Sequence, residues 1–140
     1  MTESQLQVEK LLQHFAAGST EPLHLKEGVC ALCHEQGQEA AVLEVPEHSD
    51  SLLLHCHLFE ADEQIYPLLL QLNFEMGAMR GCWLALDEHN AIRLCYQQPL
   101  RQLDESVFSH MLNGFITQTV EVREFISDLL NRHATLKAEA

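Results

Sequence analysis

Apolar residues recur at helical spacing near both ends of the chain. In residues 3–17 they form one stripe, which consists of Val8, Leu11, Leu12 and Phe15. Gly18 follows this stripe, where a helix would end. Residues 107–130 repeat apolar side chains every three or four positions, and Asp104 precedes them as a candidate N-cap. The pattern predicts an amphipathic helix near each end, of which the second is the longer.

Between these helices, short apolar runs separated by polar segments predict strands. Three runs cover residues 29–34, 40–45 and 51–58, and segments 35–38 and 46–50 between them have the composition of turns. The third run alternates, with Leu52, Leu54, Cys56 and Leu58 on one face. We therefore expect three antiparallel strands with one apolar face.

A second helix and a hairpin follow. Asp62 is the expected start of a helix over residues 63–74, and the glycines of GAMRG, residues 77–81, predict a tight turn from that helix into a strand. The stretch WLALDEHNAIRLCYQQPL, residues 83–100, predicts two strands around a polar turn. The expected fold is α+β in the order α-β-β-β-α-β-β-α, with an antiparallel sheet packed against helices in one domain over residues 1–140.

Charge narrows the function classes. The chain has 8 basic and 21 acidic residues and a net charge of -13, which disfavours nucleic acid and anionic membrane surfaces as partners. The longest nearly apolar run, residues 65–72, is far shorter than the roughly 20 residues that span a bilayer, so we expect no membrane insertion. Residues 1–10 do not resemble a signal peptide and the five cysteines are odd in number, so we expect a cytoplasmic protein.

The motif CALCH offers a zinc-binding alternative. Cys30 and Cys33, joined by His55 and His57 from the third strand, would form its ligand set. Positions i and i+3 of an extended strand point to opposite faces, so the two cysteines could share a metal ion only across a local turn. We expect no metal and no other cofactor, but a small zinc-binding protein stays open as an alternative.

No catalytic pattern accompanies the nine histidines. The chain has no G-x-S-x-G, G-x-G-x-x-G, G-x-x-x-x-G-K-[ST] or H-E-x-x-H motif. Cys56, Cys82 and Cys95 are expected to be small core residues. The sequence therefore predicts a protein that is not an enzyme.

The order, size and charge of the chain resemble those of a known family. The match is best over LLLQLNFEMGAMRGCWLALDEHNAIRLCYQQPLRQLDESVFSHML, residues 68–112, where a helix leads through glycine to a strand pair and an Asp-initiated long helix. This layout is similar to that of class I chaperones of bacterial type III secretion, the Tir-chaperone and Yersinia-effector-chaperone type. The resemblance implies an acidic homodimer that works without ATP, binds the N-terminal segment of one or more effectors, keeps it non-globular and helps target it to the secretion ATPase.

The resemblance also implies site residues. The expected effector-binding residues are Leu11, Leu12, Phe15, Val29, Ala31, Leu43 and Val45. The expected dimer-interface residues are Leu69, Leu72, Trp83 and Leu84. A regulatory dimer that binds some other protein would use the same surfaces and stays open as a second alternative.

Overall fold

The computed structural model describes residues 1–19 and 21–139, with side chains through Ala134. Its helices and strands are α1 (Glu3–Phe15), β1 (Val29–Cys33), β2 (Glu39–Glu44), β3 (Ser51–Glu60), α2 (Tyr66–Leu72), α3 (Met76–Met79), β4 (Trp83–Leu86), β5 (Ala91–Pro99) and α4 (Glu105–Glu139). Short 3-10 turns precede α2 (Glu63–Ile65) and α4 (Leu100–Gln102). The predicted α+β class and antiparallel sheet are confirmed.

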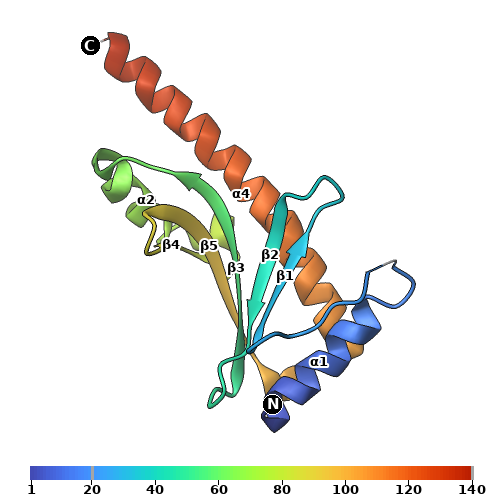
Figure 1. The fold of residues 1–140 in the computed structure, drawn as a ribbon. Coiled ribbons are helices and arrows are strands. Elements are labelled where there is room, and N and C mark those ends of the chain that lie inside the picture. The colour runs from blue at the N-terminus through green and yellow to red at the C-terminus, as the bar shows by residue number, and fades with distance from the viewer. Residues whose placement is uncertain (20, 140) are drawn as a thin grey trace.

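The sheet is antiparallel throughout, with the strand order β1-β2-β3-β5-β4 (Figure 1). β3 pairs with β5 along the whole length of β3, from Ser51 to Glu60. β2 pairs with β3 only where residues 42–44 face residues 53–55. Beyond that short ladder the two strands diverge (Figure 1). The sheet is therefore continuous at one end of β3 and split at the other.

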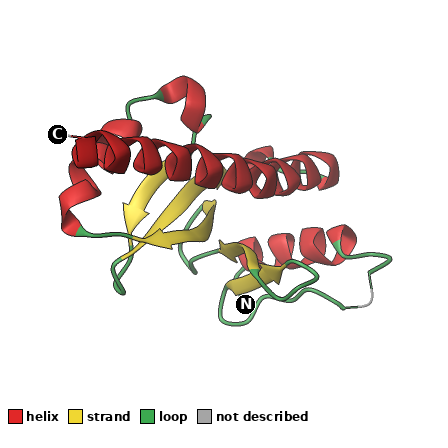
Figure 2. Cartoon of the chain, turned by 90° about the horizontal axis from the view of Figure 1, so that it is seen from above, coloured by secondary structure: helices red, strands yellow, loops and turns green. Residues whose placement is uncertain are grey.

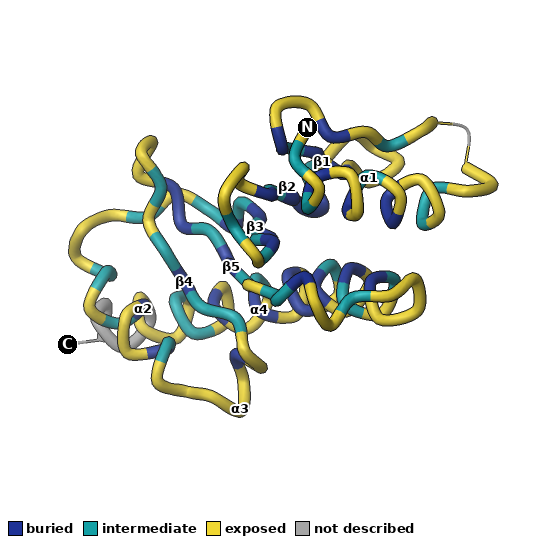
Figure 3. The backbone as a smooth tube through the Cα atoms, turned by 90° about the horizontal axis from the view of Figure 1, so that it is seen from below, coloured by how far each residue is buried: buried dark blue, intermediate teal, exposed yellow. Residues whose placement is uncertain are grey.

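The helices cover one face of the sheet. α4 runs across that face, and α1 lies beside its first half (Figures 1 and 2). Alternate β3 residues are buried under the helices, as the dark segments of the strands in Figure 3 show, and they are Leu52, Leu54, Cys56 and Leu58. These residues join the helix stripes in one core, in which Phe108 and Leu112 of α4 are fully buried.

Local sequence explains most helix ends. Thr2 and Gln5 form a capping box at α1, in which each side chain binds the other's backbone N–H. Asp104 caps α4 as predicted, because its Oδ1 accepts the Val107 N–H at 2.8 Å. Asp62 stands at the N-cap position of the 3-10 turn before α2, where the helix was predicted to start, but its side chain makes no capping bond.

Between β3 and β4 the chain differs from the prediction. The single helix expected over residues 63–74 begins as a 3-10 turn and ends at Leu72, and a further short helix, α3, stands where GAMRG predicted only a turn. The predicted tight turn lies at the end of GAMRG, where Arg80 and Gly81 both have positive φ. None of the helices in the described part of the chain has the length and apolar character needed to cross a membrane.

Candidate protein-binding surfaces

A groove of about 870 Å³ lies between α1, the start of β3 and residues 99–105. Leu6 of α1 is 48% exposed at this groove, and Leu11 lines it as well. Gln7 donates from Nε2 to the Leu100 carbonyl at 3.3 Å and so ties α1 to the segment before α4. The groove combines an apolar floor with a polar rim, which suits an apolar side chain from a partner protein.

The segment between α1 and β1 is held by one carboxylate. Glu9 accepts the Leu25 N–H at 2.8 Å through Oε2, and its Oε1 lies 2.8 Å from His24 Nδ1. Partial burial raises the pKa of Glu9, but these hydrogen bonds outweigh that effect and hold the pKa below its ordinary value. The path of the chain into β1 is thereby fixed against α1.

β1 is an edge strand whose outward main-chain groups can be deduced from its register. Val45 N–H donates to the Gly28 carbonyl, and hydrogen-bonded pairs alternate along an antiparallel ladder, so Cys30 and Leu32 bond inward to β2. The outward groups belong to Val29 and Ala31, and also to Cys33, because beyond the register shift after Leu32 the next inward bond is that of the His34 N–H to the Gln38 carbonyl. Val29 already exchanges both bonds with Lys26. Ala31 and Cys33, which are both exposed, are left as a two-residue open edge.

The opposite edge of the sheet, β4, is closed at its centre. The Asp87 N–H donates to the Ala91 carbonyl, and hydrogen-bonded pairs alternate along the β4–β5 ladder from there. The backbone N–H and carbonyl of Leu84 therefore point away from β5. The Asn73 side chain takes both of its groups, since Oδ1 accepts the Leu84 N–H at 2.7 Å and Nδ2 donates to the Leu84 carbonyl at 3.2 Å. An amide side chain thus stands where a neighbouring strand would pair.

Exposed apolar side chains lie on β4, on α2 and on the segment that follows α2 into α3. Leu70, Phe74, Met76 and Leu86 are exposed at 66%, 84%, 76% and 46%. Two of them, Leu70 and Leu86, line an apolar pocket of about 130 Å³ between α2 and β4, with Leu69 and Ile92 also in its wall. Exposed apolar groups that gather on one surface mark a protein interface.

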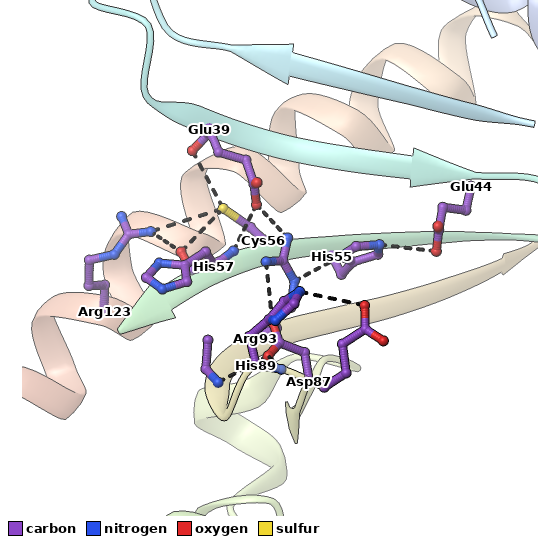
Figure 4. A network of polar contacts seen from close by, with 11 residues as sticks. Glu39, Glu44, His55, Cys56, His57, Asp87, His89, Arg93 and Arg123 are labelled. Atoms are coloured by element: carbon purple, nitrogen blue, oxygen red, sulfur yellow. Dashed lines mark hydrogen bonds and ion pairs between the residues drawn. The ribbon is translucent and has the colours of Figure 1, made fainter. Parts of the chain in front are cut away.

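A polar network lies on the face of the sheet that the helices leave uncovered. Arg93 is at its centre: Nε donates to His55 Nδ1 at 2.9 Å, Nη2 binds Glu39, and Nη1 lies 3.7 Å from Asp87 (Figure 4). His55 Nε2 in turn lies 3.1 Å from Glu44 Oε2. The network joins β2, β3, β5 and the β4–β5 turn.

The expected effector-binding residues differ in exposure. Ala31 is exposed and Val29 is half-buried on β1. Phe15 is half-buried and meets the buried Phe108 edge-on, with ring centroids 6.2 Å apart. Leu11 is 8% exposed, and Leu12, Leu43 and Val45 lie in the core. Direct contact with a partner by these last three is not possible in this conformation, although the site as a whole stays a prediction.

The expected dimer-interface residues are also mostly buried. Leu69, Leu72 and Leu84 are buried, and Trp83 is half-buried. The interface stays a prediction, but the exposed side chains of that region are the four apolar residues described above, which sequence reasoning missed. A usable signal was present, since Leu6, Leu70 and Phe74 lie off the buried helical stripes.

The zinc alternative lacks a ligand set. Cys30 is buried and Cys33 is exposed, as their positions on opposite faces predicted, and His55 is engaged by Arg93 and Glu44. Burial raises the pKa of the Cys30 thiol, which disfavours the thiolate that binds metal. Within residues 1–19 and 21–139, no group of three or more His, Cys, Asp or Glu side chains is placed to hold a metal ion.

Comparisons with known proteins agree with the fold. The model of the Tir chaperone protein (CesT) family matches residues 10–123. A chain in the HopA1–SchA chaperone–effector complex is 20% identical with a TM-score of 0.72, covering 89% of this chain and 98% of its own. A chain in the ExsC–ExsE complex is 22% identical with a TM-score of 0.73, covering 93% of this chain and 97% of its own. A chain in the ExoT–SpcS complex from Pseudomonas aeruginosa is 22% identical with a TM-score of 0.53, covering 89% of this chain and 97% of its own. Among curated proteins none matches.

Proposed function

The chain belongs to the Tir chaperone protein (CesT) family, and we propose that it is an ATP-independent chaperone that binds the N-terminal segment of a type III secretion effector. One of the similar solved structures, the HopA1–SchA complex, is described as a chaperone–effector complex, which supports an effector as the partner. The proposed role is binding, needs no catalytic step, and takes place in the bacterial cytoplasm.

The observation that carries this proposal is the open edge at Ala31 and Cys33. A peptide in extended conformation can add to an exposed strand edge, where main-chain bonds give affinity and side-chain pockets give specificity. The α1 groove with Leu6 and Leu11 supplies a site for an apolar side chain of the same segment. An extended, non-globular cargo segment is the kind of ligand that these two features fit.

We propose that a second copy covers the apolar surface of Leu70, Phe74, Met76 and Leu86. A two-fold interface brings the same residues of both copies together, so one apolar surface serves both. Because Asn73 occupies the centre of the β4 edge, the copies would meet through side chains there. Presentation of the bound effector to the secretion ATPase is part of the same proposal.

Capture from the source cell followed by native mass spectrometry tests this function. We expect two copies of the chain with one copy of a type III effector. Leu6→Glu should reduce the captured effector, because it places a charge in the α1 groove. Val120→Glu makes the same kind of change at a 40% exposed position of α4 outside both surfaces and should not reduce it. Failure of the wild-type protein to retain any effector would refute the proposal.

A further inference from the structure

β3 has an inner edge that no strand covers. Because Val42 pairs with His55, a longer β2 ladder would bring Ala40 opposite His57. Residues 39–41 of β2, before Val42, instead diverge from β3, while β5 stays paired with β3 to Glu60 (Figure 1). The backbone N–H and carbonyl of His57 therefore point toward the side where β2 no longer pairs with β3.

Two side chains occupy this inner edge. Glu39 Oε1 accepts the His57 N–H at 2.9 Å, and Arg123 Nη2 donates to the His57 carbonyl at 2.6 Å (Figure 4). Arg123 Nε also donates to the carbonyl of Leu58, at 3.3 Å, where the β3–β5 register shifts. Leu58 is the extra residue of this β-bulge, whose carbonyl is left without a ladder partner. The side chains of Glu39 and Arg123 thus bond the backbone groups of β3 that a longer β2–β3 ladder would have bonded.

Glu39 connects the parts of the sheet on either side of the split directly, and Arg123 connects β3 to α4, which lies against both parts. Glu39 belongs to β2 and also binds Arg93 of β5, which reaches Asp87 in the β4–β5 turn. Arg123 belongs to α4, which packs against both β2 and β3. Together with the short β2–β3 ladder and the His55–Glu44 pair, these contacts join the β1–β2 hairpin to the β3–β5–β4 part of the sheet.

We propose that Glu39 and Arg123 are positioning residues for effector binding, which fix the orientation of the β1–β2 hairpin relative to the β3–β5–β4 part. This inference rests on the proposed function, because the open edge at Ala31 and Cys33 is on the hairpin, while the α1 groove is lined in part by Ser51 of β3 and Pro99 of β5, on the other part. A segment long enough to contact both parts binds well only when their spacing is fixed beforehand, since ordering on binding lowers affinity.

Distance measurement by double electron–electron resonance tests the orientation without an effector. Nitroxides are attached to the exposed Cys33 and, through Glu88→Cys, to the β4–β5 turn, in a Cys82→Ala background. The remaining cysteines are buried, so they are protected from the label. We expect Arg123→Gln and Glu39→Gln to broaden the distance distribution. Arg132→Gln removes the same charge from an exposed position of α4 and should leave it unchanged.

Arg123→Lys keeps one donor for the His57 carbonyl and should restore a distribution narrower than that of Arg123→Gln. This variant keeps the test valid if Arg123→Gln impairs folding. Distributions that remain as narrow as the wild type in both Gln variants would overturn the proposal.

The binding affinities of two peptides from the captured effector test whether the hairpin orientation matters for effector binding. The long probe is the whole segment that the chaperone protects from proteolysis, and the short probe is the peptide that pairs with β1. We expect Arg123→Gln to weaken the long probe by about tenfold or more, because simultaneous contacts are lost, and to leave the short probe unchanged. Equal weakening of both probes, or no weakening of the long one, would overturn the proposal. Absence of any effector would refute the proposed function, while the distance measurement would still decide the orientation.

Discussion

Ala31→Pro should weaken strand addition at β1 without unfolding the protein. The Ala31 N–H points away from β2, so proline removes an outward donor and leaves the inward bonds of Cys30 and Leu32 in place. Proline is tolerated on an edge strand when its nitrogen faces solvent. The substitution therefore separates binding from folding, which a core substitution could not do.

The magnitude follows from the bonds that are lost. An incoming strand would exchange two hydrogen bonds with Ala31, and the proline ring prevents both. Each bond contributes a net of about 0.5–1.5 kcal/mol, so the loss is about 1–3 kcal/mol. This corresponds to a rise in Kd of roughly 5- to 150-fold for the effector segment.

Isothermal titration calorimetry with a synthetic peptide of the captured effector segment measures this change. Ala31→Ser keeps the N–H and is the matched control, for which we expect a Kd close to that of the wild type. Urea unfolding should show that both variants remain folded. A Kd for Ala31→Pro equal to the wild-type value would refute the assignment of the open edge.

Three further substitutions test other parts of the structure. Asn73→Leu should lower the free energy of unfolding by about 1–2 kcal/mol, through loss of both bonds to Leu84, and increase light scattering; unchanged scattering would contradict the role of Asn73 at the β4 edge. Gly28→Ala should destabilise by at least about 1–3 kcal/mol, since Gly28 has φ +79 and an added Cβ would lie 2.7 Å from the Val45 carbonyl oxygen; urea midpoints check this, and a wild-type midpoint would contradict it. Glu9→Gln should cost about 1 kcal/mol at neutral pH. Because the folded pKa of Glu9 is lowered, its contribution is present above the unfolded pKa and is lost as pH falls through the folded pKa, so a pH-independent difference in urea midpoints would contradict this reasoning.

Periodicity was sufficient for the elements that have one buried face. The alternation in β3 and the long stripe of α4 gave their faces correctly, because burial in the core is what selects those residues. The segment 63–81 was less predictable, since Pro67 and two glycines allow several short structures there and tertiary packing decides among them. The extra helix α3 is the result.

The candidate site was predictable at the level of elements but not of side chains. Apolar residues such as Leu12 and Leu43 fit a core and a binding groove equally well by composition, and only the fold shows that they are buried. The roles of Asn73, Glu39 and Arg123 depend on backbone groups far away in sequence. No local pattern indicates that an amide or a guanidinium will stand in for a strand.

The open edge on β1 is short, and its length has a consequence for the protein when no partner is bound. Stacking of strands into a fibril requires about six or seven consecutive residues that pair in register. The edge offers only Ala31 and Cys33, bounded on one side by the Lys26–Val29 bonds and on the other by the turn into β2. Such an edge is shorter than the run of residues that a fibril requires, so in the folded protein it offers too little backbone for further copies to stack on.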